Sequence, residues 1–122
     1  MSAQTQIKST APIFPVSDLQ TSLRFYAAMG FLGNAWDDQY AMILRGESGI
    51  HLRLENTPLK ENNPSGAYFY VETGIGDLYA EFLANHVPFC SPLAIREWKM
   101  NEFQVSDPDG NLLRFGEPLS KI

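Results

Sequence analysis

The sequence predicts an α+β fold in which two βαβββ modules form a curved mixed sheet around a cleft. Two observations lead to this prediction. Each half of the chain has one helical stripe, with a strand-like run before it and further strand-like runs after it. A shift of 56 residues also lays the first stripe on the second, with Leu19 on Ile75, Leu23 on Tyr79 and Gly30 on His86. Because a repeated unit that cannot cover its own sheet must close against a second copy, we expect a ligand in the cleft between the two.

The first module covers residues 11–55 and begins with a strand at 12–16. Ser17 and Gln20 form a capping box that opens the first helix, and Gly30 ends it. Three strand-like runs follow this helix, at 31–36, 40–45 and 50–55. The order of elements is therefore βαβββ.

Residues 56–65 are rich in Pro and Asn and show no periodicity, so we expect a linker there. The second module covers residues 66–118, with a strand at 67–71 and a helix within 74–87. Its remaining strands are expected at 88–90, 100–105 and 112–115. With 122 residues, the chain is predicted to be a single domain over 1–122.

The composition is that of an ordinary globular protein, with 44% hydrophobic and 19% charged residues. The polar N-terminal segment and the lack of a long apolar run predict a cytoplasmic location and no membrane association. Lys and Arg are scattered, so we expect no nucleic-acid partner. The net charge of -5 favours a cationic ligand. Cys90 is expected to be a buried, reduced thiol, because it is the only cysteine.

The alternation of side chains along each strand separates a core face from a cleft face. In the run 40–45 both faces are apolar, and we assign Ala41 and Ile43 to the core. The residues assigned to the cleft face, and predicted to bind a ligand, are Tyr40, Met42, His51, Arg53, Tyr68, Tyr70, Trp98, Met100, Glu102 and Arg114. A lining rich in aromatic residues and methionine suits a planar or bulky organic ligand.

The charged and titratable cleft residues each allow two interpretations. Glu102 and Arg114 fall on neighbouring strands, so they form either a cross-strand ion pair or, through Glu102, a contact for a cationic ligand. His51 is either a base or ligand contact or a structural residue, and a lone histidine is not a metal site. His86 is expected at a helix C-terminus, where its charge would complement the helix dipole.

The stretch "SDPDGN" contains enough oxygen ligands to suggest a calcium loop. Counting from Asp107, however, places Leu112 where such a loop needs glycine and Pro118 where it needs glutamate. Pro108 and Gly110 instead suit a tight turn, with Gly110 in the left-handed conformation. We therefore expect a structural turn that closes the last hairpin.

Three segments, 15–31, 76–87 and 102–118, resemble the bleomycin-resistance and glyoxalase-like branch of the vicinal-oxygen-chelate superfamily. The resemblance extends over about residues 11–118. It implies the glyoxalase/bleomycin-resistance fold of two βαβββ modules, with the cleft typically completed across a homodimer.

Metal-dependent members of this family carry four metal ligands, and the matching positions here are Ala11, His51, Gly66 and Arg114. Only His51 could bind a metal, and a guanidinium at the last position would repel a cation. The resemblance therefore implies that no metal or other cofactor is used.

By resemblance, the expected function is metal-free binding that sequesters a bulky, cationic aromatic antibiotic of the bleomycin type, which would confer antibiotic resistance. One alternative is a glyoxalase-like lyase or isomerase in which His51 is the general base and Arg114 or a tyrosine hydroxyl stabilises negative charge. Another is a metal-dependent dioxygenase with altered ligands. The expected partners are a small molecule and a second copy of the chain.

Overall fold

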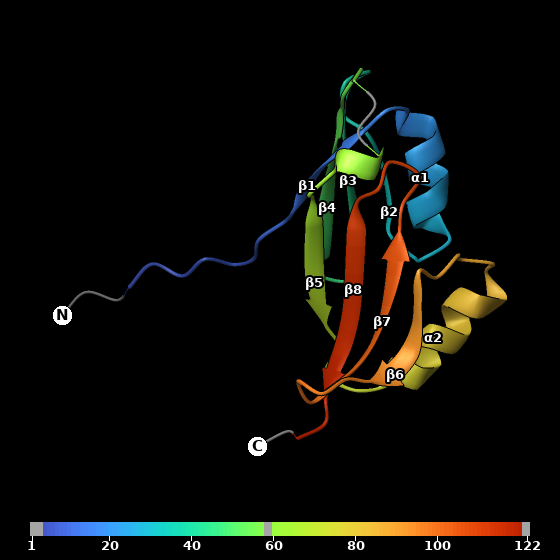
Figure 1. Cartoon of the computed structure of the whole chain (residues 1–122). Helices are drawn as coiled ribbons and strands as arrows, with labels where there is room; N and C mark the ends of the chain where they lie inside the picture. The colour runs from blue at the N-terminus through green and yellow to red at the C-terminus, as the bar shows by residue number, and fades with distance from the viewer. Residues whose placement is uncertain (1–3, 58–59, 121–122) are drawn as a thin grey trace.

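The computed structural model describes residues 4–57 and 60–120 (Figure 1). Its strands and helices, in chain order, are β1 (Ile13–Val16), α1 (Leu19–Ala27), β2 (Leu32–Ala35), β3 (Tyr40–Arg45), β4 (Ser48–Leu54), the short 3-10 helix η1 (Lys60–Asn62), β5 (Gly66–Tyr70), α2 (Ile75–Ala84), β6 (Ser91–Ile95), β7 (Met100–Ser106) and β8 (Leu112–Pro118). The predicted α+β fold class is confirmed.

The strands form two four-stranded mixed sheets, with the orders β1-β4-β3-β2 and β5-β8-β7-β6. In the first sheet β1 is parallel to β4, and in the second sheet β5 is parallel to β8. The remaining pairs are antiparallel. Figure 1 shows α1 beside the first sheet and α2 beside the second, on the same side of the molecule. The two sheets are separate, and each leaves the strand face away from the helices uncovered.

The hydrophobic core lies between the sheets and the helices, as the strand alternation predicts. Ala41 and Ile43 in β3 are buried, which confirms the assignment made for this ambiguous strand. The second half of the core is aromatic, since Phe103 and Phe115 stack with ring centroids 5.2 Å apart and Phe82 of α2 packs edge-on against both. Such aromatic pairs add to the stability gained from area burial.

The first helix begins one residue later than expected. Asp18, not Ser17, is the N-cap residue, and its carboxylate accepts a hydrogen bond of 2.9 Å from the backbone N–H of Thr21. Both residues are good helix caps, and the extended backbone of Asp18, at φ -153°, decides between them. The predicted pairing of Ser17 with Gln20 was therefore wrong.

Both helices end in the same way. Gly30 after α1 has a φ of 79°, and His86 after α2, 56 positions later, has a φ of 61°. The next N–H in each case reaches back to the last turn, from Phe31 to Tyr26 and from Val87 to Phe82, at 3.0 Å. These are Schellman-type ends, and His86 takes a left-handed position that normally favours glycine.

Two expectations for the segment that follows α2 were wrong. The strand expected at 88–90 lies instead at Ser91–Ile95. It contains Pro92 and an irregular register, both of which are tolerated because β6 is an edge strand. Cys90 precedes this strand and is exposed rather than buried.

The turn before β8 connects the two halves of the chain. The N–H of Gly110, which has a φ of 83°, donates to the carbonyl of Asp107 at 3.1 Å, and this confirms the expected turn. The buried Asp107 carboxylate accepts a hydrogen bond of 2.7 Å from the Tyr26 hydroxyl in α1. Asn111 donates to the carbonyl of Pro15 in β1 at 2.9 Å. The turn aspartate is therefore a buried structural residue.

A second connection lies at the helix C-termini. Arg45 at the end of β3 forms an ion pair with Glu81 of α2, with 3.0 Å between Nη2 and Oε1, and it donates to the carbonyl of Met29 at 3.0 Å. Asn85 donates to the carbonyl of Ala28, also at 3.0 Å. The two helices and sheets are thus held together by polar contacts as well as by the core.

Candidate functional site

The first group of predicted site residues lies on the open face of the first sheet. Tyr40 pairs with Arg53 and Met42 with His51 across β3 and β4, so all four side chains are on the face opposite to the buried Ala41. Met42 is 41% exposed. Strand alternation therefore placed these four residues on the correct face.

His51 and Tyr40 form a hydrogen-bonded pair within this group. The Tyr40 hydroxyl and His51 Nδ1 are 2.8 Å apart, and the two rings meet edge-on with centroids 5.4 Å apart. In one tautomer the hydroxyl donates to Nδ1. In the other Nδ1 donates to the hydroxyl and leaves Nε2 as an acceptor. Arg53 is paired with Glu55 at 3.1 Å, so its charge is partly compensated.

The second group lies on the open face of the second sheet. Tyr68 and Tyr70 come from β5, with ring centroids 4.8 Å apart, and Trp98 comes from the turn between β6 and β7. Tyr70 is 77% exposed and Trp98 is 53% exposed. The remaining members, Met100, Glu102 and Arg114, come from β7 and β8. Large aromatic side chains in such exposed positions are typical of binding surfaces.

Glu102 differs from its neighbours because it is fully buried, at 0% exposure. Its carboxylate accepts hydrogen bonds from Tyr68 at 2.7 Å, Trp98 at 3.2 Å and Gln104 at 3.3 Å. Burial alone would raise the pKa of Glu102, but these hydrogen bonds and the nearby Arg114 outweigh it and lower the pKa below its ordinary value. The carboxylate is therefore charged at neutral pH.

The structure does not contain the cross-strand ion pair that we considered for Glu102 and Arg114. Across β7 and β8, Glu102 lies opposite Gly116, whereas Arg114 lies opposite Gln104. Within the part of the chain that the structure describes, Arg114 makes no hydrogen bond or ion pair, and it acts on Glu102 only through its charge. Its exposed guanidinium is therefore free to meet an anionic group.

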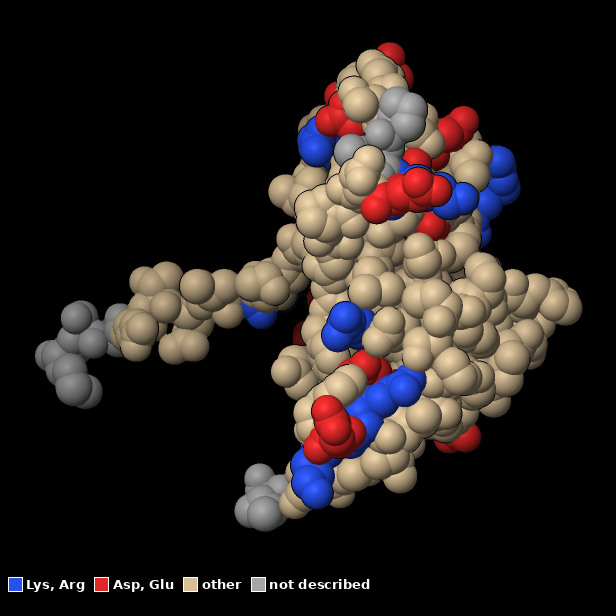
Figure 2. All heavy atoms as spheres, viewed as in Figure 1, with Lys and Arg blue, Asp and Glu red and all other residues tan. Residues whose placement is uncertain are grey.

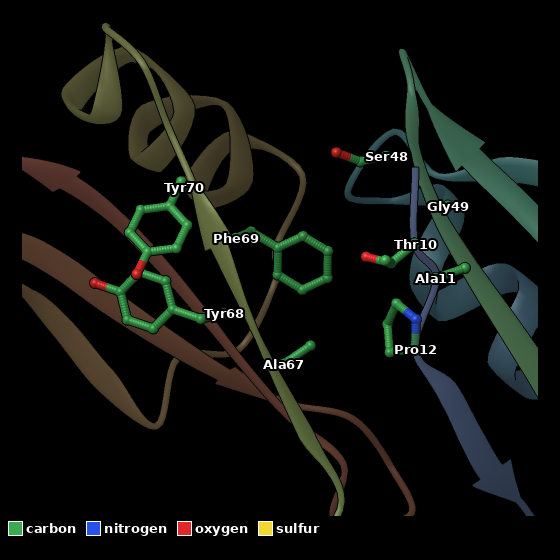
Figure 3. Close-up of a pocket in the computed structure, with 9 residues that line it drawn as sticks. All are labelled: Thr10, Ala11, Pro12, Ser48, Gly49, Ala67, Tyr68, Phe69 and Tyr70. Carbon is green, nitrogen blue, oxygen red and sulfur yellow. The ribbon is translucent and has the colours of Figure 1, made fainter. Parts of the chain in front are cut away.

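A groove of about 440 Å³ lies where the two sheets meet (Figure 3). It is lined by Thr10, Ala11, Pro12, Ser48, Gly49 and the β5 residues Ala67, Tyr68, Phe69 and Tyr70. Figure 3 shows Ala67 and Phe69 pointing across it towards residues 10–12, while Tyr68 and Tyr70 project from the other side of β5. A second groove, of about 400 Å³, extends from Tyr68 to Arg114 and Leu112.

The predicted site residues thus form two groups, one on each sheet. Among the residues described, no hydrogen bond, ion pair or ring contact connects the Tyr40–His51 group with the group around Tyr68.

The four positions that would hold a metal do not form a metal site here. Ala11 and Gly66 have no donor atom, and the guanidinium of Arg114 cannot ligate a cation. In the described chain, no group of three or more His, Cys, Asp or Glu residues could hold a metal ion. The donor set at these positions therefore does not fit a metal ion.

Sequence reasoning missed several residues of the open faces. Ile13, Leu32 and Leu44 share the face of Met42 and are exposed, and their positions in the alternation could have revealed them. Gly116 was missed as well, because a missing side chain leaves no pattern. A Cβ atom there would lie 2.0 Å from the Tyr68 hydroxyl.

The surface charge agrees with the scattered pattern seen in the sequence. Figure 2 shows Lys and Arg in small groups, intermixed with Asp and Glu, on the visible face. Separately, among the described residues, no helix combines the length and the apolar character needed to cross a membrane.

Comparisons with known proteins agree with the fold. No curated protein matches the chain in sequence. Similar solved structures include a bleomycin-binding protein in complex with bleomycin, at 19% identity and a TM-score of 0.79, covering 91% of this chain and 98% of that one. A bleomycin resistance determinant encoded on the transposon Tn5 is 17% identical with a TM-score of 0.82, and the match covers 92% of this chain and 98% of that one. A glyoxalase-related enzyme from Clostridium phytofermentans is 20% identical with a TM-score of 0.72, and the match covers 96% of this chain and 99% of that one.

These similarities show that the two sheets and two helices have the glyoxalase/bleomycin-resistance fold. A sequence match to the family described as Glyoxalase/Bleomycin resistance protein/Dioxygenase superfamily extends over residues 6–115, which is most of the chain. The chain belongs to this superfamily.

Proposed function

We propose that this protein is a metal-free binding protein that sequesters a bulky aromatic small molecule, with bleomycin-type antibiotics as the first ligands to test. The observation that carries this proposal is the set of exposed aromatic side chains, above all Tyr70 and Trp98, on the open face of the second sheet. Flat rings of this kind stack on planar ligands. The names of two similar structures, a bleomycin-binding protein and a bleomycin resistance determinant, point to the same class of ligand.

We further propose that a second copy of the chain completes the site as a homodimer. Both sheets leave the face away from the helices open, and on the first sheet this face carries the exposed apolar residues Ile13, Leu32, Met42 and Leu44. Apolar patches of this kind are usually covered by a partner. The partner would bring the first-sheet face of one copy opposite the second-sheet face of the other.

Calorimetric titration with metal-free bleomycin tests the ligand, and analytical ultracentrifugation tests the dimer. We expect saturable binding with one ligand per chain and a sedimenting species of twice the mass of the chain. The variant Trp98→Ala should weaken bleomycin binding by about tenfold or more. An aromatic side chain that the ligand covers contributes more than about 1.4 kcal/mol to the binding free energy. No heat of binding with bleomycin would reject this ligand.

A second candidate function is favoured by the Tyr40–His51 hydrogen bond of 2.8 Å. If Nδ1 of His51 donates to the hydroxyl, Nε2 is an acceptor that could serve as the general base of a lyase or isomerase. Arg114, one candidate for stabilising developing negative charge, lies on the second sheet, whereas His51 lies on the first. Turnover that persists unchanged in His51→Ala would rule out this function.

A further inference from the structure

The Glu102 carboxylate occupies a position that a charge partner for a ligand would not need. It lies on the strand face that points to the open cleft, yet it is 0% exposed. Two aromatic residues of the predicted ligand site cover it. Both the Tyr68 hydroxyl and the Trp98 Nε1–H donate to the same oxygen, Oε1, at 2.7 and 3.2 Å. A ligand cation could reach this oxygen only by displacing one of the two rings.

The surrounding backbone is shaped for this arrangement. Glu102 in β7 lies opposite Gly116 in β8, and the Tyr68 hydroxyl passes directly over that glycine. A Cβ atom at position 116 would lie 2.0 Å from the hydroxyl and 3.1 Å from Met100 Cε. The missing side chain therefore provides the space through which Tyr68 reaches the carboxylate.

The other carboxylate oxygen, Oε2, accepts from the side-chain amide of Gln104 at 3.3 Å. Both oxygens of Glu102 are thus engaged by neutral donors of the protein itself. Hydrogen bonds to a charged acceptor are stronger than those between neutral groups, and they hold the donors in a defined orientation. The donors held in this way are Tyr68 and Trp98, which come from different segments of the chain.

We propose that Glu102 is a positioning residue, whose buried carboxylate holds the rings of Tyr68 and Trp98 in the orientation that receives an aromatic ligand, and that it does not contact the ligand itself. This inference rests on the proposed function and deepens it. It also changes the role expected from the sequence, because the negative charge of Glu102 would not select for a cation. Ring orientation, rather than charge, would be what this residue contributes.

Two substitutions of nearly equal size separate the roles. Glu102→Gln removes the charge but keeps an oxygen that can accept from Tyr68 and Trp98, while its amide can donate to a rotated Gln104. Glu102→Leu keeps the volume and removes both acceptors. A positioning role predicts that Glu102→Gln behaves like the wild type and that Glu102→Leu does not.

The first readout needs no ligand. The chain has two tryptophans, so in a Trp36→Phe background the single indole N–H signal in a ¹H–¹⁵N spectrum belongs to Trp98. We expect this N–H to stay protected from solvent exchange in Glu102→Gln and to exchange faster in Glu102→Leu. Equal protection in both variants would overturn the proposal.

The second readout uses the cationic dye thioflavin T and its neutral analogue 2-(4-dimethylaminophenyl)-6-methylbenzothiazole, which lacks only the N-methyl group that gives thioflavin T its charge. We expect Glu102→Leu to weaken both dyes by about tenfold, because two rings must then be ordered on binding, and Glu102→Gln to change either by less than about threefold. Loss of the cationic dye alone in Glu102→Gln would make Glu102 a charge partner and overturn the proposal.

The two readouts keep the two proposals separate. If the wild type binds neither dye, the proposed ligand class fails for these probes, and the indole signal still decides whether Glu102 holds Trp98. If Glu102→Leu does not fold, Tyr68→Phe replaces it, because this variant keeps the ring and loses only the hydroxyl that reaches Glu102. Unchanged dye affinities in Tyr68→Phe would then contradict the positioning role.

Discussion

The hydroxyl of Tyr26 donates a hydrogen bond of 2.7 Å to Oδ2 of Asp107, 81 positions further along the chain. Tyr26 is 0% exposed in α1, and Asp107 opens the turn before β8. The same carboxylate accepts from the backbone N–H groups of Asp109 and Asn111 at 2.9 and 2.8 Å. Burial raises the pKa of Asp107, and the hydrogen bonds only partly offset this. The first helix and the last hairpin are thus joined through one buried acid.

Tyr26→Phe should therefore destabilise the protein by about 1–3 kcal/mol, because the buried carboxylate loses a donor that no water can replace. Urea denaturation gives the free energy of unfolding. Tyr79→Phe is the matched control, since Tyr79 is a helix tyrosine that packs on Phe89 and Phe103 without a hydrogen bond from its hydroxyl in the described structure. Equal losses in the two variants would contradict this role of the hydroxyl.

The ion pair between Arg45 and Glu81 makes part of the stability depend on pH. The hydrogen bond from Arg45 lowers the pKa of Glu81 below its ordinary value, although partial burial acts in the opposite direction. A lowered pKa in the folded state means that this stability is present above the ordinary glutamate pKa and is lost as the pH falls through the folded value. Both side chains are more than a third exposed, so solvent screening keeps the contribution small.

Glu81→Gln should accordingly cost about 0.5 kcal/mol at pH 7, and the difference from the wild type should shrink at an acidic pH below the ordinary glutamate pKa. Urea denaturation at both pH values measures it. Glu47→Gln is the control, because Glu47 is exposed and has no ion pair in the described structure. A difference that persists in full at the lower pH would show that Glu81 acts through packing and not through its charge.

His86 holds a left-handed backbone conformation, with a φ of 61°, at a helix end where the first helix has Gly30. The left-handed conformation destabilises the folded state by about 1–2 kcal/mol for a residue with a side chain. Glycine avoids this strain but loses more conformational entropy on folding, which offsets about half of the gain. His86→Gly should thus stabilise the protein by about 0.5–1 kcal/mol. Thermal unfolding of the variant and the wild type measures the difference.

Ala80→Gly, at an exposed position inside α2, serves as the opposite control for His86→Gly. It should destabilise by about 1 kcal/mol, because the backbone there is helical and gains nothing from glycine. If both glycine variants were destabilised alike, the strain assigned to His86 would be refuted.

Strand alternation predicted much of this structure because its period depends only on the backbone. It placed Ala41 and Ile43 in the core and Met42 on the open face, even though all three are apolar. It could not place β6, because Pro92 interrupts the pattern and only the edge position of the strand accommodates it. Strand alternation therefore predicts a strand correctly where neighbouring strands lie on both sides of it, and it fails for a strand at the edge of the sheet.

The candidate site shows the same limit for side chains. Alternation assigned Glu102 to the open face, and in the structure Glu102 does lie on that face of β7. Its carboxylate is buried because Tyr68 and Trp98 lie over it. These two residues are 34 and 4 positions away in the sequence. No local pattern contains this information, because it depends on how β5, β7 and β8 lie side by side.

Gly116→Ala tests whether that three-strand arrangement holds Tyr68 in place. The new Cβ would lie 2.0 Å from the Tyr68 hydroxyl, which is the far end of a side chain that can rotate away. We expect the protein to stay folded with a loss of about 1 kcal/mol. We also expect the Tyr68 ring to leave Glu102, with a change in the near-UV circular dichroism of the Tyr68–Tyr70 pair.

Gly33→Ala provides the contrast, because its Cβ would lie 2.1 Å from the backbone oxygen of Met42, which cannot rotate away. This variant should lose about 2–3 kcal/mol, since β2 and β3 must separate locally, and the aromatic signal around Tyr68 should not change. The pair therefore distinguishes a strand that needs space for its backbone from one that needs space for a neighbouring ring. If Gly116→Ala left the Tyr68 signal intact, the glycine would have no part in orienting that ring.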